Sequence, residues 1–180
     1  MIIYYLLSTG YEKSFKQFQS ELNNTGESLA EIVSSTSKIF LERQMSNVSF
    51  SARLGASIAD INPDATVTFD QVITNNGGNY SPVTGIFTAP VDGTYYFTSS
   101  ILTKSPSTVE MVLRVNGISK MLMYAGAKNV GYNNAVNSVI VQLRAADEVK
   151  IAKSGIYGSR PFYIHGGWST FSGFLISQSL

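Results

Sequence analysis

The chain has 180 residues, of which 44% are hydrophobic and 14% are charged, so it can bury a core and is not a disordered protein. It contains no cysteine and one histidine, which excludes disulfides, thiolate metal sites and zinc sites built from several histidines. The formal net charge of +1 argues against a dedicated nucleic-acid-binding protein. Residues 101–180 nevertheless carry eight basic and three acidic side chains, which favours an anionic partner.

The chain opens with an apolar run from Met1 to Leu7. This run is about a third of the roughly 20 residues that a membrane-spanning helix needs, so we predict no transmembrane segment. It resembles the core of a secretory signal peptide but has neither a basic leader nor a clear small-residue cleavage site. Whether a leader was removed therefore stays open at this point.

Residues 12–43 contain helix-forming residues and no proline, and their apolar side chains follow a heptad spacing. Alternating steps of three and four residues predict a coiled coil rather than a surface helix whose apolar stripe drifts. Gly26 costs about 1 kcal/mol relative to alanine, so this helix needs partner chains or the following domain. One amphipathic helix packed on its own domain is the alternative. The expected seam between subunits consists of Phe15, Phe18, Leu22, Leu29, Ile32 and Ile39.

From Val48 onward the apolar residues recur with a period of two, which is typical of β-strands. Asn116-Gly117 supplies the two positive-φ residues of a type I′ hairpin turn. Short strands separated by Gly, Asn and Pro indicate an antiparallel sandwich or barrel. We therefore divide the chain into an N-terminal segment, residues 1–47, and a globular head, residues 48–180. The clearest strands are expected around residues 67–69, 95–97, 109–115, 139–143 and 149–151.

The last expected strand is apolar on both faces. Trp168, Phe174 and Ile176 fall on one face, and Phe171 and Leu175 fall on the other. A strand of this kind must be covered twice, once by the core and once by a neighbouring subunit. We predict that Phe171 and Leu175 lie in the interface of a trimer.

The head resembles the globular domain of the complement C1q family. Its signature positions are matched by Phe69, Asn75, Tyr80, Phe87, Gly93, Tyr95 and Phe97, while Ser99 replaces the usual aromatic residue. The most diagnostic stretch is 86–97, and residues 139–149 and 168–176 are similar to the family's late hairpin and closing strand. Residues 160–165 are most similar to the C1q-domain proteins of bivalve molluscs.

The resemblance implies an all-β fold, a ten-stranded antiparallel jelly roll related to tumour necrosis factor, assembled as a homo-trimer. It also implies a secreted, lectin-like protein of innate immune pattern recognition, which binds glycans or anionic ligands of microbial surfaces. The coiled coil would replace the collagen stalk, and trimerisation raises avidity by about 10²–10⁴ over single-site affinity. A structural protein that forms a matrix and a cytokine-like ligand of a protein receptor are the alternatives.

Some heads of this family hold calcium through aspartates ahead of the late hairpin. Residues 125–137 of this chain contain no carboxylate, which is the ligand that calcium prefers. We therefore expect no metal and no cofactor. The chain also lacks a phosphate-binding glycine loop, a nucleophile elbow and a metal-binding motif, so we expect no enzymatic activity.

Two loops combine aromatic rings with amide or basic groups, a composition that suits sugar binding. Arg160 is the candidate for holding a carboxylate or phosphate. Alternatively, the asparagines serve turn geometry, the tyrosines pack on the sheet and His165 is a structural hydrogen-bonding residue. The candidate ligand-binding residues are Tyr124, Lys128, Asn129, Tyr132, Asn133 and Asn134 in the first loop, and Tyr157, Arg160, Tyr163 and His165 in the second.

Asn23 and Asn47 begin two sequons for N-glycosylation. Asn47 lies at the expected junction of stalk and head and is the better candidate. Asn23 occupies an exposed heptad position. Both matter only if the chain is secreted.

Overall fold

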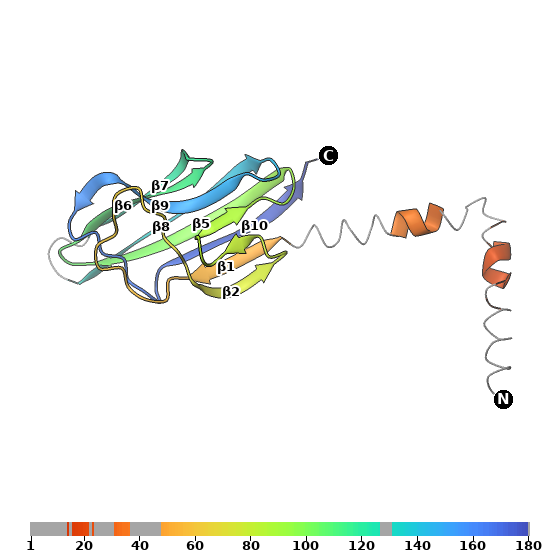
Figure 1. Cartoon of the computed structure of the whole chain (residues 1–180), viewed down its shortest axis with the longest axis horizontal. Helices are drawn as coiled ribbons and strands as arrows, with labels where there is room; N and C mark the ends of the chain where they lie inside the picture. The colour runs from red at the N-terminus through yellow and green to blue at the C-terminus, as the bar shows by residue number, and fades with distance from the viewer. Residues whose placement is uncertain are drawn as a thin grey trace, which may run out of the picture. The chain divides into compact units, whose positions relative to one another are not determined.

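The computed structural model describes residues 48–126 and 131–179, and in the N-terminal part residues 14, 16–21, 23 and 31–36 (Figure 1). The chain divides into two compact units, residues 1–43 and residues 44–180. Within the second unit, the described part of the head consists of residues 48–126 and 131–179.

The described residues of the first unit are helical. Phe18 is exposed and Ile32 is partly buried, while the other expected seam residues, Phe15, Leu22, Leu29 and Ile39, lie outside the described residues. Asn23 is helical and exposed, and Asn47 lies outside the described residues. The coiled coil and both sequons therefore stay predictions. In the part of the chain that is described, no helix is long and apolar enough to cross a membrane.

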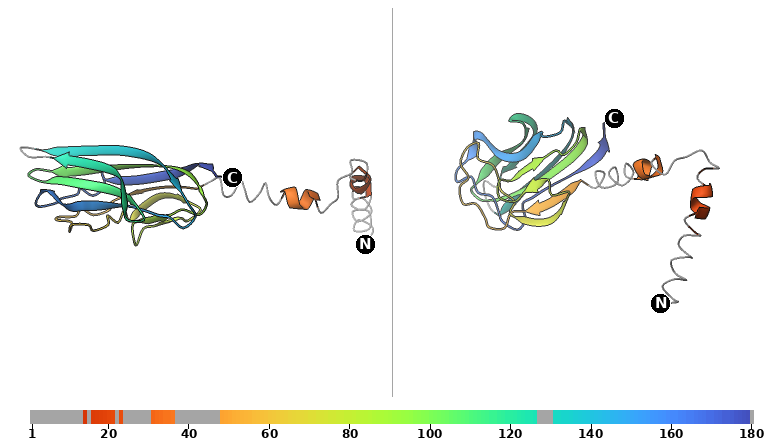
Figure 2. Two further views of the ribbon diagram at one scale, coloured as in Figure 1. Left: turned by 90° about the horizontal axis from the view of Figure 1, so that it is seen from above. Right: turned by 45° about the vertical axis from the view of Figure 1, so that its right-hand side comes forward.

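The head consists of two five-stranded sheets in which every strand pair is antiparallel (Figures 1 and 2). The first sheet has the order β2-β1-β10-β5-β8 and the second has the order β3-β4-β9-β6-β7. This architecture confirms the predicted ten-stranded antiparallel jelly roll. The strands are β1 (Ser49–Arg53), β2 (Gln71–Asn76), β3 (Tyr80–Ser81), β4 (Ile86–Thr88), β5 (Gly93–Lys104), β6 (Thr108–Val115), β7 (Ile118–Gly126), β8 (Tyr132–Leu143), β9 (Glu148–Ser159) and β10 (Thr170–Gln178).

The strands follow the alternation of the sequence because one face of each sheet meets the core. In β5, Tyr95, Phe97 and Ile101 are fully buried together with Ser99, and the alternate residues, such as Tyr96 and Thr98, face outward. The predicted hairpin between β6 and β7 is confirmed: Asn116 has a φ of 49° and Gly117 a φ of 81°.

Aromatic rings fill the centre of the core. The ring of Phe50 lies 4.7 Å from that of Tyr80, 5.2 Å from that of Phe87 and 4.9 Å from that of Phe171, measured between centroids. Gly173 pairs with Phe50 across β1 and β10. A Cβ atom at Gly173 would lie 2.9 Å from the Phe50 ring and even closer to another core ring, so only glycine leaves room for this stack.

The expected strand at residues 67–69 is wrong. Val67 and Phe69 are fully buried, as their hydrophobicity suggests, but they lie on an irregular segment. The Tyr80 hydroxyl takes the place of a neighbouring strand, because it accepts from Phe69 N–H at 3.2 Å and donates to the Phe69 carbonyl at 3.1 Å. One side chain thus satisfies both backbone groups of a buried residue.

The prediction for β10 is also wrong for Phe171. Its side chain is fully buried and packs on Phe50, so it is not available to a neighbouring subunit. Leu175 is partly buried against the same core. Phe174 and Ile176 are the exposed apolar residues of β10. The two faces were assigned the wrong way round because period-two spacing separates the faces of a strand without showing which one meets the core.

Stability is expected to fall as the pH rises from 10 to 12. Burial raises the pKa of Tyr80 from 10.0 to about 12, so the folded state keeps its proton in a range where the unfolded state loses it. Tyr80→Phe should cost about 1–3 kcal/mol at neutral pH, because Phe69 loses its hydrogen-bond partner. It should also flatten the alkaline decline, although Tyr95, whose pKa burial likewise raises, keeps part of it. Urea unfolding at several pH values tests both effects, and a decline as steep as that of the wild type would contradict the assignment to Tyr80.

Candidate functional site

Three of the predicted ligand-binding residues come together at one end of the first sheet. The rings of Tyr132 and Tyr163 both pack edge-on against His165, at centroid distances of 5.5 and 6.0 Å. The ammonium of Lys104 lies 4.4 Å from the centre of the Tyr163 ring. We call the cluster formed by Lys104, Tyr163, His165 and Tyr132 the apical strip. It lies at the end where β5 finishes and β8 begins, opposite the end that carries the C-terminus (Figure 1).

The apical strip is assembled by strand pairing and by loop hydrogen bonds. Lys104 is the register partner of Tyr132 across β5 and β8. The segment between β9 and β10 is fixed to β5, because His165 N–H donates to the Leu102 carbonyl at 2.8 Å and the Thr103 hydroxyl donates to the Tyr163 carbonyl at 2.7 Å. Residues from both predicted loops therefore form one site, with Tyr132 on a strand and with Tyr163 and His165 on the segment that is fixed to β5.

Hydrogen bonds also orient the rings of the strip. The Tyr163 hydroxyl lies 2.9 Å from the Ser57 hydroxyl, which also accepts from Gly166 N–H. His165 Nδ1 lies 2.6 Å from the Gly166 carbonyl oxygen, so Nδ1 must be the donor. In the neutral imidazole, Nε2 is then a hydrogen-bond acceptor.

Arg160 does not join the strip as an available cation. Its guanidinium forms an ion pair with Asp60 and stacks over the Phe162 ring, with 4.9 Å from Cζ to the ring centre. The Asp60 carboxylate also accepts from Phe162 N–H at 2.8 Å. Arg160 therefore fixes the loop between β9 and β10, and Lys104, which the sequence did not single out, is the cation of the strip.

The other candidate residues are spread over the head. The side-chain oxygens of Asn133 and Asn134 accept from Gly126 N–H and the Ser100 hydroxyl, at 3.3 and 2.9 Å. Tyr124 is exposed on β7 of the second sheet and Tyr157 is exposed on β9. Lys128 and Asn129 lie outside the described residues. Asn133 and Asn134 thus lie on β8 rather than in a turn, and their side-chain oxygens make hydrogen bonds within the protein.

The outward side of the first sheet is a second candidate surface. Cross-strand pairs place Phe174, Tyr96 and Ile140 in one row, and the next row consists of hydroxyl-bearing residues, namely Ser51, Ser172, Thr98 and Ser138. We call these two rows the outer face. Ile140 is 62% and Phe174 46% exposed, with 5.2 Å between the Phe174 and Tyr96 ring centres.

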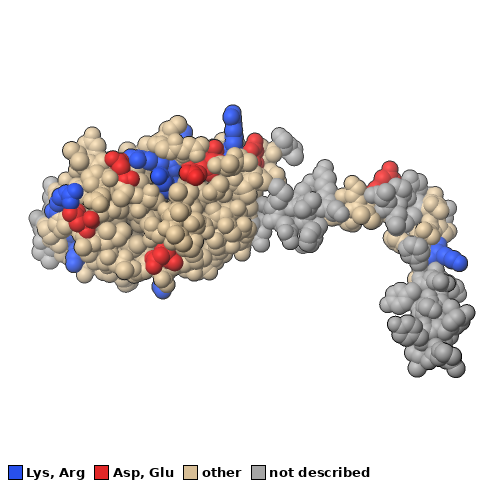
Figure 3. Space-filling view, viewed as in Figure 1, with Lys and Arg blue, Asp and Glu red and all other residues tan. Residues whose placement is uncertain are grey.

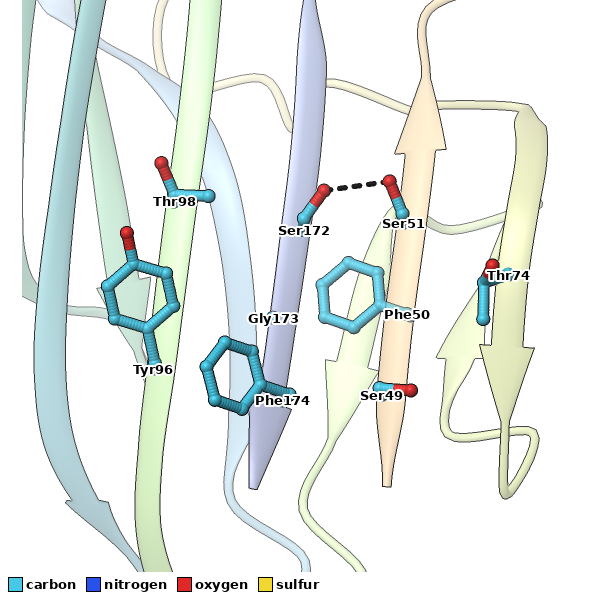
Figure 4. Close-up of a pocket in the computed structure, with 9 residues that line it drawn as sticks. All are labelled: Ser49, Phe50, Ser51, Thr74, Tyr96, Thr98, Ser172, Gly173 and Phe174. Atoms are coloured by element: carbon cyan, nitrogen blue, oxygen red, sulfur yellow. Dashed lines mark hydrogen bonds between the residues drawn. The ribbon is translucent and has the colours of Figure 1, made fainter. Parts of the chain in front are cut away.

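A shallow hollow of about 250 Å³ lies on the outer face over Gly173 (Figure 4). Phe174 and Tyr96 lie side by side at one edge of this hollow. A hydrogen bond of 2.9 Å connects the hydroxyl oxygens of Ser51 and Ser172. These rows contain no charged side chain. The second sheet, in contrast, bears Glu110, Arg114 and Lys150 at its outward positions. An uncharged apolar row of this kind is typical of an interface.

Comparison with known proteins adds relatives in sequence and in fold. A family model for the C1q domain matches residues 49–176. The heavy metal-binding protein HIP of Mytilus edulis is 41% identical over 130 residues, which cover 72% of this chain and 61% of that protein. The chain therefore spans about three fifths of that relative's length.

Two solved structures are similar in fold alone. The globular domain of zebrafish complement 1qA protein has a TM-score of 0.61 and 19% identity, covering 74% of this chain and 100% of that one. The Eiger TNF of S. frugiperda has a TM-score of 0.57 and 12% identity, covering 74% of this chain and 94% of that one.

Proposed function

Because the chain belongs to the C1q domain family, we propose that it is a secreted, trimeric recognition protein whose heads bind anionic glycans of microbial surfaces. Proteins of this family are commonly trimeric, typically extracellular and typically not enzymes. The predicted similarity to bivalve C1q-domain proteins is confirmed by the family match and by the relative from Mytilus edulis. The ligand, the trimer and secretion are the proposed parts.

The apical strip is the observation that supports a glycan ligand. A sugar stacks its apolar C–H face on an aromatic ring and hydrogen-bonds through its hydroxyls. The strip offers three neighbouring rings, of which Tyr132 is 62% exposed. His165 Nε2 adds an acceptor for a hydroxyl group.

Lys104 supports an anionic rather than a neutral glycan. Its ammonium lies over the Tyr163 ring, and its backbone pairs with Tyr132, so a carboxylate or sulfate on a sugar bound at these rings would meet it. Arg160 has a carboxylate partner already in Asp60, so a ligand anion would have to compete with that partner. Acidic and basic side chains lie interspersed on the face shown in Figure 3, which favours a local anion contact over attraction by a broad charged surface.

The outer face supports the trimer. Its apolar row would be exposed to water in a monomer, whereas a neighbouring head would bury it. Trimerisation presents three glycan sites together, which raises the apparent affinity for a multivalent surface by about 10²–10⁴. Weak single sites therefore suffice for recognition.

We propose that binding does not depend on a metal. The relative from Mytilus edulis is named for heavy-metal binding, but soft metal ions favour thiolate and imidazole ligands, and this chain has no cysteine and one histidine. Within residues 48–126, 131–179 and the described helical residues, no group of three or more His, Cys, Asp or Glu side chains gathers to hold a metal. The donor set thus does not fit the chemistry in the relative's name.

A glycan array with the full chain tests the proposed function. We expect binding to carboxylated or sulfated glycans, and Tyr132→Ala should weaken it about tenfold through loss of one stacking ring. Lys104→Gln should reduce binding to anionic glycans while leaving any binding to their neutral counterparts unchanged. A chelator should have no effect.

Arg144→Gln is the matched control, because it removes one exposed positive charge from the turn between β8 and β9 at the other end of the head. It should bind as the wild type does. If the wild type binds no glycan on the array, the glycan proposal is refuted. Equal losses for Lys104→Gln and Arg144→Gln would show a general charge effect and reject the strip as the site.

A further inference from the structure

Strand β9 carries a bulge that exposes two large apolar side chains. In its pairing with β6, Lys153 lies opposite Met111 and Gly158 opposite Val109, so residues 154–157 share the place of the single residue Glu110 and protrude. Ile156 is 78% and Tyr157 65% exposed. Two adjacent apolar side chains of this size are costly to leave in water, and they need an explanation.

A fully buried lysine supports the base of this bulge. Lys153 Nζ donates to the carbonyl oxygens of Ser154 and Gly155, both at 3.1 Å, and of Tyr157 at 2.6 Å. The same ammonium lies 4.2 Å from the centre of the Phe162 ring. Burial lowers the pKa of Lys153, while the carboxylates of Glu110 and Asp64 act in the opposite direction. A buried ammonium loses its hydrogen bonds to water, and the three carbonyl groups provide hydrogen bonds in their place.

Further contacts hold the bulge in one conformation. The Ser154 hydroxyl donates to the Glu110 carboxylate at 2.9 Å. Hydrogen bonds from Arg114 and from Gly155 N–H lower the pKa of Asp64, whose carboxylate lies 2.6 Å from the Arg114 guanidinium. Gly158 has a φ of 109°, and a Cβ atom there would lie 2.1 Å from the Thr108 carbonyl oxygen. The bulge therefore returns to β6 through a contact that only glycine allows.

We propose that Ile156 and Tyr157 form a preorganised contact point for a peptide segment of a protein partner that carries apolar side chains. A rigid loop binds with little loss of conformational entropy, and tyrosine is frequent at the centres of protein interfaces. The ion pairs Arg160–Asp60 and Arg114–Asp64 lie on segments that contact the base of the bulge, so charges that are already paired lie close to the apolar side chains. This is the composition of a protein interface with a polar rim.

Other classes of ligand fit this surface less well. A sugar needs hydrogen-bonding groups, but the carbonyls of Ser154, Gly155 and Tyr157 are already occupied by Lys153. An anionic membrane needs unpaired cations, but the neighbouring guanidinium groups face carboxylates. This contact point is separate from the apical strip, so the inference does not depend on the proposed glycan function.

A selection of phage-displayed random peptides on the immobilised full chain tests the inference. Peptides from such a library are expected to gather where the surface is preorganised for protein contact. We expect most recovered peptides to lose at least about tenfold in affinity for the double variant Ile156→Ser/Tyr157→Ser, which corresponds to about 1.4 kcal/mol. Val83→Ser is the matched control, because Val83 is an equally apolar residue with 83% exposure, and it should leave binding unchanged.

Lys153→Met tests the preorganisation with both contact residues intact. Thermal melting checks that this variant folds. The folded variant should bind the same peptides more weakly than the wild type, because three carbonyl groups of the bulge lose their common hydrogen-bond donor. If Lys153→Met does not fold, the double variant Ile156→Ser/Tyr157→Ser still tests the contact point. Glycan binding should be unchanged in the double variant, which separates this inference from the proposed function.

Three outcomes would overturn the inference. Recovered peptides that bind the double variant as well as they bind the wild type would show that the bulge is not a preferred contact. Binding to phosphatidylcholine–phosphatidylserine vesicles that the double variant loses would assign the bulge to a membrane. A change in oligomeric state in the double variant would assign it to contact between copies of this chain.

Discussion

Replacing Phe174 with aspartate is expected to convert the proposed trimer to monomers and to lower the apparent affinity for a glycan-coated surface by about 10²–10⁴. The change places a charge in the apolar row of Phe174, Tyr96 and Ile140, where a neighbouring head would have to bury it unpaired. Because the side chain faces away from the core, the monomer should stay folded. Sedimentation velocity and surface binding of the full chain measure the two effects.

Leu122→Asp is the matched control for this prediction. Leu122 lies on β7 of the second sheet, and its exposed fraction of 55% is close to the 46% of Phe174. The substitution therefore adds the same charge to the other side of the sandwich. It should leave the protein trimeric. A trimer that persists in Phe174→Asp would show that the outer face is not the main interface and would return that role to the predicted heptads. A wild-type monomer would reject the avidity mechanism altogether.

Replacing Phe50 with alanine is expected to lower the free energy of unfolding by about 3–5 kcal/mol. Phe50 is buried, and its ring contacts those of Tyr80, Phe87, Phe97 and Phe171, so it joins strands of both sheets. Truncation would leave a cavity that stiff β-strands cannot close. Urea unfolding followed by far-ultraviolet circular dichroism measures the loss, because the one tryptophan of the chain, Trp168, is already 70% exposed in the folded state.

Tyr124→Ala is a suitable control because Tyr124 is exposed on β7 and its loss should change stability by less than about 0.5 kcal/mol. Similar losses for both variants would contradict the central position of Phe50. Phe50→Leu should recover part of the stability, because a smaller cavity costs less.

Much of the fold can be predicted from the sequence, because alternation and turn chemistry are local properties. The spacing of Tyr95 and Phe97 places both in the core, and Asn116-Gly117 forms the expected turn. Local spacing fails where a distant group replaces a strand partner. The Tyr80 hydroxyl satisfies both backbone groups of Phe69, so the segment around Phe69 needs no ladder.

At the candidate site, too, the residue types could be predicted from the sequence, whereas their arrangement could not. The sequence pointed to Tyr132, Tyr163 and His165 by their residue types, but it placed them in two separate loops. Strand pairing joins them and adds Lys104, which has no distinctive neighbours in the sequence. Arg160 was the expected anion ligand, yet it pairs with Asp60, a hundred residues earlier in the chain.

The sequence by itself determined the class of fold, the family and the residue types available for binding, because these follow from periodicity, spacing and composition. Only the tertiary structure decided which face of β10 is buried, which rings meet and where the ammonium of Lys153 lies. The physical reason is that burial and hydrogen-bond satisfaction depend on groups brought together by folding. A lysine that reads as a surface charge in the sequence is in the structure a buried donor to three carbonyl groups.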